Sequence, residues 1–270
     1  MFKSILTLLT LGSLVLAFSC TNNNQSGGDK VAVVISSTAF HQSAGKDCDR
    51  PDSLRFNCAE VDLHWPKVDK ESEALKKAVA QWATSYLVGI LAVGSDDSTA
   101  TVTTVEAATA AFFQMHQEFT KDFPDSPMSN YVAESQDTIL LNFGKLLTLE
   151  ITGYVYAGGA HGSPTAAVAT FETTTGKQLH WDDIVTDTVA LKVLMEKKYR
   201  ETRADIFKPT DGAEPFAFDE TFPFALPLNY GLTKAGIYCH YLAYEVGPYA
   251  IGDTQFVLSF AELGAILKVE

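Results

Sequence analysis

His161 is the residue of this chain whose surroundings most suggest chemistry. It stands in "YVYAGGAHGSPT" (154–165), after a strand-like run of aromatic residues that ends in Gly158 and Gly159. An imidazole can act as a general base or a metal ligand, so His161 could work with an acidic partner such as Asp182 or Asp183. The alternative is a histidine that hydrogen-bonds to the backbone in a tight turn, where the two glycines supply a positive φ.

Other motifs give little support for catalysis or a cofactor. Ser43 to Lys46 fits S-x-x-K by letter, but in the cysteine hairpin the two side chains would not share a helical face. The six histidines are dispersed, with no H-E-x-x-H, and no cysteine pairs have zinc spacing. The glycine-rich stretch matches neither G-x-G-x-x-G nor a loop ending in GK[ST], and G-x-S-x-G is absent. We therefore expect no metal and no cofactor.

Tyrosines gather near two glycine-containing loops, "YAGGAHGSP" (156–164) and "GPYAIGD" (247–253). Tyrosine beside Gly, Ser and Pro makes a good recognition surface, because a large rigid ring loses little entropy on binding. If the two loops lie at the same edge of the sheet, their side chains could form one exposed rim; core packing on strands is the alternative. The candidate binding residues are Tyr156, Gly158, Gly159, His161, Pro248 and Tyr249.

Hydrophobic periodicity predicts the elements that position these loops. Strands are expected at 30–40, at 58–68 and within 138–159, where Leu147, Leu149, Ile151 and Val155 alternate with polar residues. A further strand pair is expected at 165–179, with its turn at Thr175-Gly176. A first helix, capped by Asp69, carries a stripe of Leu75, Val79, Trp82, Tyr86 and Ile90; a second opens at Thr103, and a third runs from about 188 to 207. Further strands are expected at 224–230, 236–246 and 254–260, with a closing helical turn at 261–267.

Runs of strands interrupted by a few helices favour an α+β fold. We expect a largely antiparallel sheet with about three packed helices, in two closely associated subdomains at 30–125 and 126–270.

The first residues are typical of an export signal. Lys3 precedes an apolar core from Ile5 to Phe18 that is too short for an ordinary membrane helix, and "LAFSC" follows. This resembles a bacterial lipoprotein signal at 1–19, cleaved so that Cys20 carries lipid, with a polar tether at 20–29. An ordinary secretory signal is the alternative. The prediction is an exported lipoprotein of the bacterial cell envelope, periplasm-facing and held to the membrane by its lipid anchor only.

Two further cysteines flank a turn-rich spacer. In an exported protein, Cys48 and Cys58 at this spacing predict a disulfide that closes a hairpin, with two free thiols as the alternative. Cys239 is expected to be a buried small hydrophobic residue.

The formal net charge is −13. A chain this acidic should repel nucleic acid and anionic lipid and attract basic partners.

Three motifs in order resemble one known family. They are Gly158 to His161 after a tyrosine-rich strand, Thr175 to Lys177, and Pro248 to Gly252 before a last strand that leads to Glu262-Leu263. They resemble the extracellular domain of RsiV-type anti-sigma factors and PdaC-type peptidoglycan deacetylases, the domain of unknown function family 3298. Residues 30–125 resemble its companion N-terminal half.

The resemblance implies recognition rather than catalysis. In RsiV-type proteins the domain senses lysozyme by binding it, and in PdaC-type enzymes it accompanies a separate catalytic domain. This sequence lacks an anti-sigma segment and a deacetylase domain, so neither activity carries over. We expect a non-catalytic envelope domain that binds a basic protein such as lysozyme, or a peptidoglycan fragment. The alternatives are a wall hydrolase that uses His161 with an acidic partner, and a structural envelope lipoprotein.

Overall fold

The computed structural model describes residues 32–51, 56–92, 102–124, 126, 128–210 and 212–268. The predicted signal peptide, Cys20 and the tether lie outside these residues. The described elements form two sheets with helices packed on them, so the predicted α+β class is confirmed. None of the helices within these ranges is both long and apolar enough to span a membrane.

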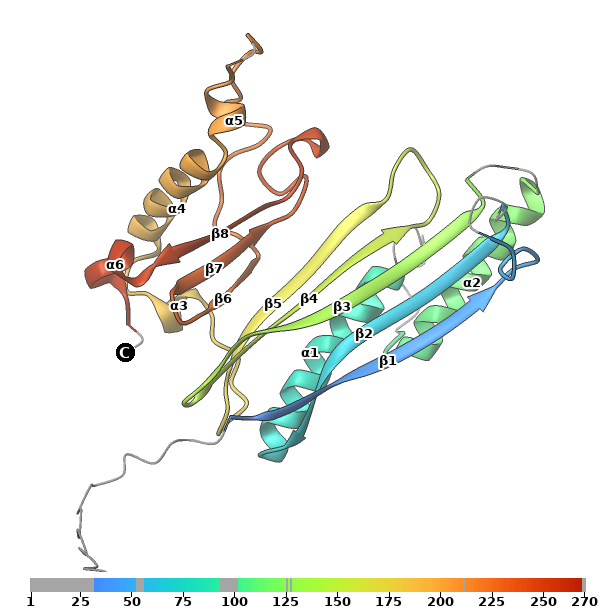
Figure 1. Ribbon diagram of the computed structural model, residues 1–270, viewed down its shortest axis with the longest axis horizontal. Coiled ribbons are helices and arrows are strands. Elements are labelled where there is room, and N and C mark those ends of the chain that lie inside the picture. Colours follow the sequence, from blue (N-terminus) through green and yellow to red (C-terminus); the bar gives the residue numbers. More distant parts are fainter. Residues whose placement is uncertain are drawn as a thin grey trace, which may run out of the picture.

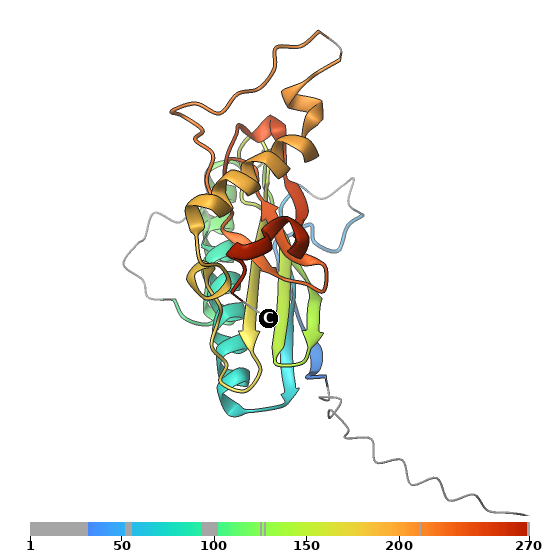
Figure 2. The ribbon, with the colours of Figure 1, turned by 90° about the vertical axis from the view of Figure 1, so that its left-hand side faces the viewer.

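The larger unit is a five-stranded sheet whose strands lie in chain order (Figure 1). Its strands are β1 (Val34–Ala44), β2 (Cys58–Lys70), β3 (Asn130–Phe143), β4 (Leu146–Tyr156) and β5 (Ser163–Glu172). The β2–β3 pair is parallel and the other three pairs are antiparallel. Neighbouring parallel strands need a long crossover. Here α1 (Glu73–Leu91) and α2 (Val105–Asp122) supply it, and they cover one face of the sheet (Figure 2).

Both helices begin at a residue other than the predicted one. The Ser72 hydroxyl accepts the Leu75 N–H at 3.2 Å and caps α1. Asp69, the predicted cap, lies in β2, because that strand stays paired with β1 as far as Lys70. In α2 the cap is Thr104, one residue after the predicted Thr103. In each case the cap is the hydroxyl that lies three residues before a free helical N–H group, which it accepts.

The core of this unit lies between the sheet and the two helices. The predicted stripe of the first helix is buried at Leu75, Val79 and Ile90, while Trp82 and Tyr86 are half-buried. The alternating residues predicted on β4 are also buried on this side of the sheet: Leu147, Leu149, Ile151 and Val155. Burial of each such aliphatic side chain contributes roughly 1.5–3 kcal/mol, so this face holds the unit together.

The smaller unit is a three-stranded antiparallel sheet of β6 (Asn229–Leu232), β7 (Gly236–Tyr241) and β8 (Thr254–Ser259). The helix α4 (Thr188–Thr202) packs on this unit and buries Leu191, Met195 and Tyr199. Short helical turns complete the unit: α3 (Trp181–Ile184), α5 (Ala204–Phe207), the 3₁₀ turn Tyr249–Ile251, α6 (Phe260–Leu263) and the 3₁₀ turn Gly264–Ile266.

Several predicted elements of this unit are shorter in the structure, including the strand expected at 236–246, which ends at Tyr241. The third helix breaks at Arg203, whose guanidinium turns inward and donates to the Ile251 carbonyl and the Thr254 hydroxyl at 3.0 and 2.9 Å. The predicted strand at 224–230 begins only at Asn229. Phe224 instead packs against the rings of Tyr199 and Tyr241, so tertiary packing prevails over the local strand pattern.

The two sheets meet on the face of β4 and β5 that α1 does not cover. Thr148 and Glu150 lie on the predicted polar face of β4, yet both are buried, because β6 and β7 cover this end of the strand. The Thr148 and Thr170 hydroxyls lie 2.9 Å apart, and Thr170 also accepts the Leu232 N–H at 2.9 Å. A Cβ at Gly231 would lie 2.4 Å from the Thr148 methyl group, so only glycine lets β6 approach this closely.

The sheets divide the chain after β5. Because β3, β4 and β5 continue the sheet begun by β1 and β2, residues 130–172 belong to the larger unit. The predicted division at 125/126 falls inside this unit, between α2 and β3.

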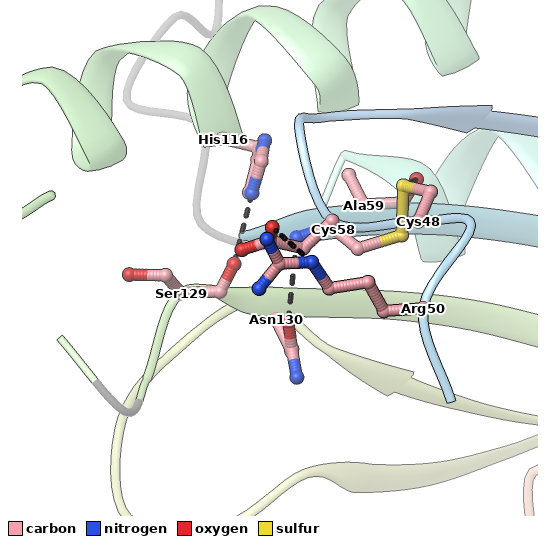
Figure 3. Close-up of a disulfide and its surroundings, with 8 residues drawn as sticks. Cys48, Arg50, Cys58, Ala59, His116, Ser129 and Asn130 are labelled. Carbon is pink, nitrogen blue, oxygen red and sulfur yellow. Dashed lines mark hydrogen bonds and ion pairs between the residues drawn. A yellow bond between two sulfur atoms is a disulfide. The ribbon is translucent and has the colours of Figure 1, made fainter. Parts of the chain in front are cut away.

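The predicted disulfide joins Cys48 to Cys58 at the start of β2 (Figure 3). Beside it, the Asn130 side chain accepts the Cys58 N–H at 3.3 Å, and the buried His116 ring lies 2.9 Å from the Ser129 carbonyl. These contacts fix the parallel start of β2 and β3. Cys239 is a free thiol and is buried, as predicted.

Candidate binding site

The two glycine-containing loops meet in the structure. The His161 ring stacks on the Tyr249 ring, with centroids 3.8 Å apart and an interplanar angle of 19°. The Tyr249 hydroxyl and His161 Nδ1 both lie 3.0 Å from the Gly162 carbonyl oxygen, which accepts from them. The loops come from different sheets, one joining β4 to β5 and the other β7 to β8. The loops therefore do not share one sheet edge, which was the condition set for a common rim, and the stack instead bridges the two sheets.

A third ring completes the group. Tyr244 lies 5.6 Å from Tyr249 and 6.4 Å from His161, and it is 57% exposed. Its φ is +72°, a conformation that a bulky residue rarely adopts. We call His161, Tyr244 and Tyr249 the aromatic rim. Its residues are solvent-accessible and come together from segments more than 80 positions apart.

The other predicted residues shape the loops. Gly158 and Gly159 have φ of +88° and +91°, as expected for glycines that let the chain turn. The Tyr156 hydroxyl donates to the Gly159 carbonyl at 3.1 Å, and Tyr156 is half-buried. Pro248 is exposed and precedes the 3₁₀ turn that carries Tyr249.

Tyr154 continues the aromatic surface onto the open face of the larger sheet. A Cβ at Gly162 would lie only 2.2 Å from the Tyr154 ring, so this ring rests directly against the glycine whose carbonyl holds the rim. Tyr154 is 37% exposed. Tyr241, the last residue of β7, is instead buried in the core of the smaller unit.

Carboxylates lie beside Tyr154 on the same open face. The strand register places Asp62 on β2 opposite Glu134 on β3, and Glu134 opposite Tyr154 on β4. Their neighbours Val61 and Leu63 belong to the core on the helix side, so Asp62 and Glu134 face the other way. His64 lies 3.5 Å from Asp62. These two carboxylates make this part of the open face acidic.

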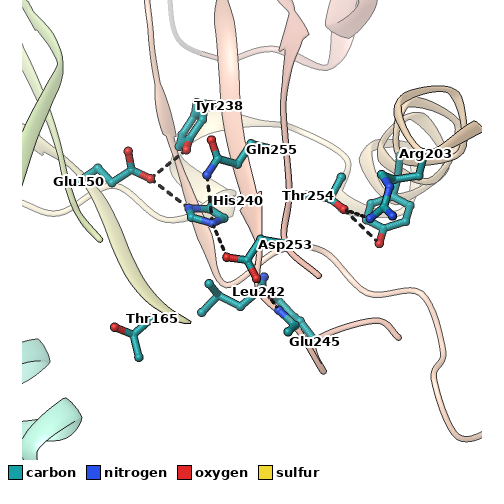
Figure 4. Close-up of polar contacts among 12 residues, drawn as sticks. Glu150, Thr165, Arg203, Tyr238, His240, Leu242, Glu245, Asp253, Thr254 and Gln255 are labelled. Carbon is teal, nitrogen blue, oxygen red and sulfur yellow. Dashed lines mark hydrogen bonds and ion pairs between the residues drawn. The ribbon is translucent and has the colours of Figure 1, made fainter. Parts of the chain in front are cut away.

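A buried polar network joins β4 of the larger sheet to β7 of the smaller one (Figure 4). His240 is 2% exposed, with Nδ1 3.1 Å from Glu150 Oε1 and Nε2 3.4 Å from Asp253 Oδ2. The same Glu150 oxygen accepts the Tyr238 hydroxyl at 2.8 Å, and the Gln255 amide nitrogen lies 3.2 Å from His240 Nε2.

Sequence reasoning missed this network. Glu150 and His240 lie 90 positions apart, and each sits in an ordinary alternating strand. The one available signal was a pair of polar residues, Tyr238 and His240, alternating with Cys239 and Tyr241 on β7.

The network shifts the pKa values of its members. Burial lowers the pKa of His240, but hydrogen bonds and charges from Glu150 and then Asp253 outweigh it, so the net shift is upward. Burial raises the pKa of Tyr238, and the Glu150 charge raises it further. Burial also raises the pKa of Glu245, which accepts the Leu228 and Leu242 N–H groups. Glu150 and His240 therefore form a buried ion pair whenever the ring is protonated.

The described contacts of His161 do not include a carboxylate. Its described contacts are two tyrosine rings and a carbonyl oxygen, while Asp183 binds the Lys177 ammonium and accepts the His180 N–H at 3.0 Å. Across the residues that the structure describes, no group of three or more His, Cys, Asp or Glu side chains could hold a metal ion.

Most of the smaller unit has a recognisable family signature. Residues 182–261 match the model of DUF3298, a protein family of unknown function. The DUF3298 segment supplies Tyr244 and Tyr249 of the rim and His240 and Asp253 of the network. His161 and Glu150, their partners, come from the larger sheet outside it.

Two solved structures of DUF3298 proteins share the fold. A protein from Bacteroides fragilis has a TM-score of 0.67 and 18% identity over 90% of this chain and 96% of its own. One from Pseudomonas aeruginosa has a TM-score of 0.58 and 18% identity over 87% of this chain and 95% of its own. No curated protein matches the chain. The DUF3298 structures extend over both units, so the two sheets occur together in them as well.

Proposed function

We propose that this chain is a non-catalytic binding domain of the bacterial cell envelope that holds a basic protein, such as lysozyme, at the aromatic rim. The observation that carries the proposal is the solvent-accessible stack of His161 on Tyr249, with Tyr244 beside it. Rigid aromatic side chains of this kind supply much of the affinity of protein interfaces, because little rotamer freedom is lost when they are covered.

Charge supports a basic partner. The chain has a formal net charge of −13, and Asp62 and Glu134 stand next to Tyr154 on the open face that adjoins the rim. A basic protein would be drawn to such a surface, and its association rate would fall as salt screens the attraction. The contacts of His161 favour binding over hydrolysis. Its ring stacks on Tyr249, and none of its described contacts is a carboxylate that could orient it as a general base.

The envelope location is part of the proposal. It rests on the amino-terminal sequence, in which a lipoprotein-like signal at 1–19 precedes Cys20, and on the disulfide between Cys48 and Cys58, which suits an oxidising compartment.

The experiment is calorimetry of the protein with lysozyme and, separately, with soluble peptidoglycan fragments. Tyr249→Ala removes a ring of the rim and should weaken lysozyme binding by about 1 kcal/mol or more, roughly fivefold. Tyr249→Phe is the matched control: it keeps the stacking ring and loses only the hydrogen bond to Gly162, so it should bind more tightly than the alanine variant.

Three results would contradict the proposal. Lysozyme could fail to bind, it could bind the alanine and phenylalanine variants equally well, or binding could be indifferent to salt. A binding signal with peptidoglycan fragments but none with lysozyme would indicate a glycan ligand in place of a protein.

A further inference from the structure

We propose that His240 is a proton-binding site that couples pH to the arrangement of the aromatic rim. The bound proton would hold Glu150 of β4 and Asp253 of the β7–β8 connection on opposite nitrogens of one buried ring. The proposal rests on the proposed function only in taking the rim to be the surface that binds the partner.

The ring has a suitable partner for each of its charge states. In the imidazolium both nitrogens carry hydrogen, so Nδ1 donates to Glu150 and Nε2 to Asp253. In the neutral ring with hydrogen on Nδ1, the Nε2 lone pair can accept the amide N–H of Gln255, which lies 3.2 Å away. Loss of the proton therefore exchanges Asp253 for Gln255 as the partner of Nε2.

Each carboxylate is attached to one side of the rim. Four residues beyond Glu150, β4 reaches Tyr154, and it then leads into the loop that carries His161. Asp253 closes the opposite loop, where its other oxygen accepts the Ala243 N–H at 2.9 Å, next to Tyr244. The protonated ring is thus a bridge between the two segments whose rings must meet, and the neutral ring leaves Asp253 held by Ala243 alone among its described partners.

The loop around Tyr244 depends on such bonds. Tyr244 has φ of +72°, which the surrounding structure must impose, and the neighbouring Leu242 and Ala243 N–H groups are both held by carboxylates. A change in the partner of Asp253 acts directly on this turn. The groups that face the ring from the packed elements are Glu150 on β4, Tyr238 on β7, Glu245 and Asp253 in the connection, and Gln255 on β8.

The direction of the pH effect follows from these charges. Burial lowers the pKa of His240, yet Glu150 and Asp253 together raise it above the ordinary value of about 6.5. The bridge is therefore complete below about pH 6.5, where the ring would be protonated even in the unfolded chain, and it is lost as pH rises through the raised pKa of the folded protein. Burial raises the pKa of Glu245 above its ordinary value. A variant must therefore separate the titration of Glu245 from that of His240.

NMR titration of the protein alone tests the coupling. Between pH 5 and 9, the Ala243 amide and the His240 ring carbons should shift with one midpoint above 6.5. Asp253→Asn keeps an oxygen for the Ala243 N–H but removes the charge, so the His240 midpoint should fall and the Ala243 shift should shrink. His41→Gln removes an exposed histidine of β1 that belongs to neither the rim nor the network, and it should leave both shifts in place.

The result that overturns the proposal is an Ala243 amide that does not move with His240, or one that keeps its midpoint in His240→Gln. If that variant fails to fold, the Asp253→Asn titration decides the question. Lysozyme binding then provides a separate measurement. Its affinity should fall as pH rises and His240 loses its proton. The fall should be about tenfold for each unit by which lysozyme binding raises the His240 pKa. Because the titration needs no ligand, failure of the coupling and failure of lysozyme binding are distinguishable.

Discussion

Gly231→Ala tests the way in which the two sheets meet. A Cβ at this position would lie 2.4 Å from Thr148 Cγ2, 2.9 Å from Val168 Cγ1 and 3.2 Å from Thr170 Oγ1. All three side chains are β-branched and buried, so they have few rotamers into which they can move. Overpacking of this kind costs about 1–3 kcal/mol, which in a chain of this size lowers the melting temperature by roughly 2–4 °C per kcal/mol.

Gly89→Ala is the matched control for the same chemical change. Gly89 is exposed within α1, and a Cβ there would meet nothing within 4 Å. Alanine in an exposed helix interior should stabilise the protein by about 0.5–1 kcal/mol relative to glycine. We therefore expect urea unfolding to show a lower free energy of unfolding for Gly231→Ala and a higher one for Gly89→Ala. A Gly231→Ala variant as stable as the parent would mean that β6 does not lie against Thr148 and Val168.

Two further predictions concern the cysteines. Reduction of the Cys48–Cys58 disulfide should lower the free energy of unfolding by about 2–3 kcal/mol, because the released loop gains chain entropy in the unfolded state; unchanged unfolding in reductant, measured against a Cys48→Ser/Cys58→Ser variant, would contradict this. Cys20→Ala should abolish lipid labelling and release the protein from membranes, and a variant that remained acylated and membrane-bound would refute the predicted anchor.

Sequence patterns predicted correctly those features of the fold that depend only on nearby residues in the chain. The period-two run on β4 placed Leu147, Leu149 and Ile151 correctly on a buried face, because alternation along a strand is a local property. The same pattern assigned Glu150 to a polar face, which the smaller sheet then buries. No local pattern records which strand will cover another, so this burial could not be predicted.

The site divides in the same way. The need for positive φ at Gly158 and Gly159 was predicted from the composition of the loop. The meeting of His161 with Tyr249 was predicted only on the condition of a shared sheet edge, and the structure brings these rings together by a different route, across two sheets. The Glu150–His240 contact was missed entirely. It depends on how the two units pack, and no local pattern in either segment indicates that packing.

Hydrogen exchange of the protein with and without lysozyme tests most directly whether the aromatic rim is the binding surface. The account predicts that lysozyme slows exchange of the backbone amides in the loops 157–162 and 242–252, on both sides of the His161–Tyr249 stack, while the amides of α2 on the opposite face of the larger sheet exchange as before. Protection confined to α2 or to the outer surface of α4, with none in the two loops, would contradict it.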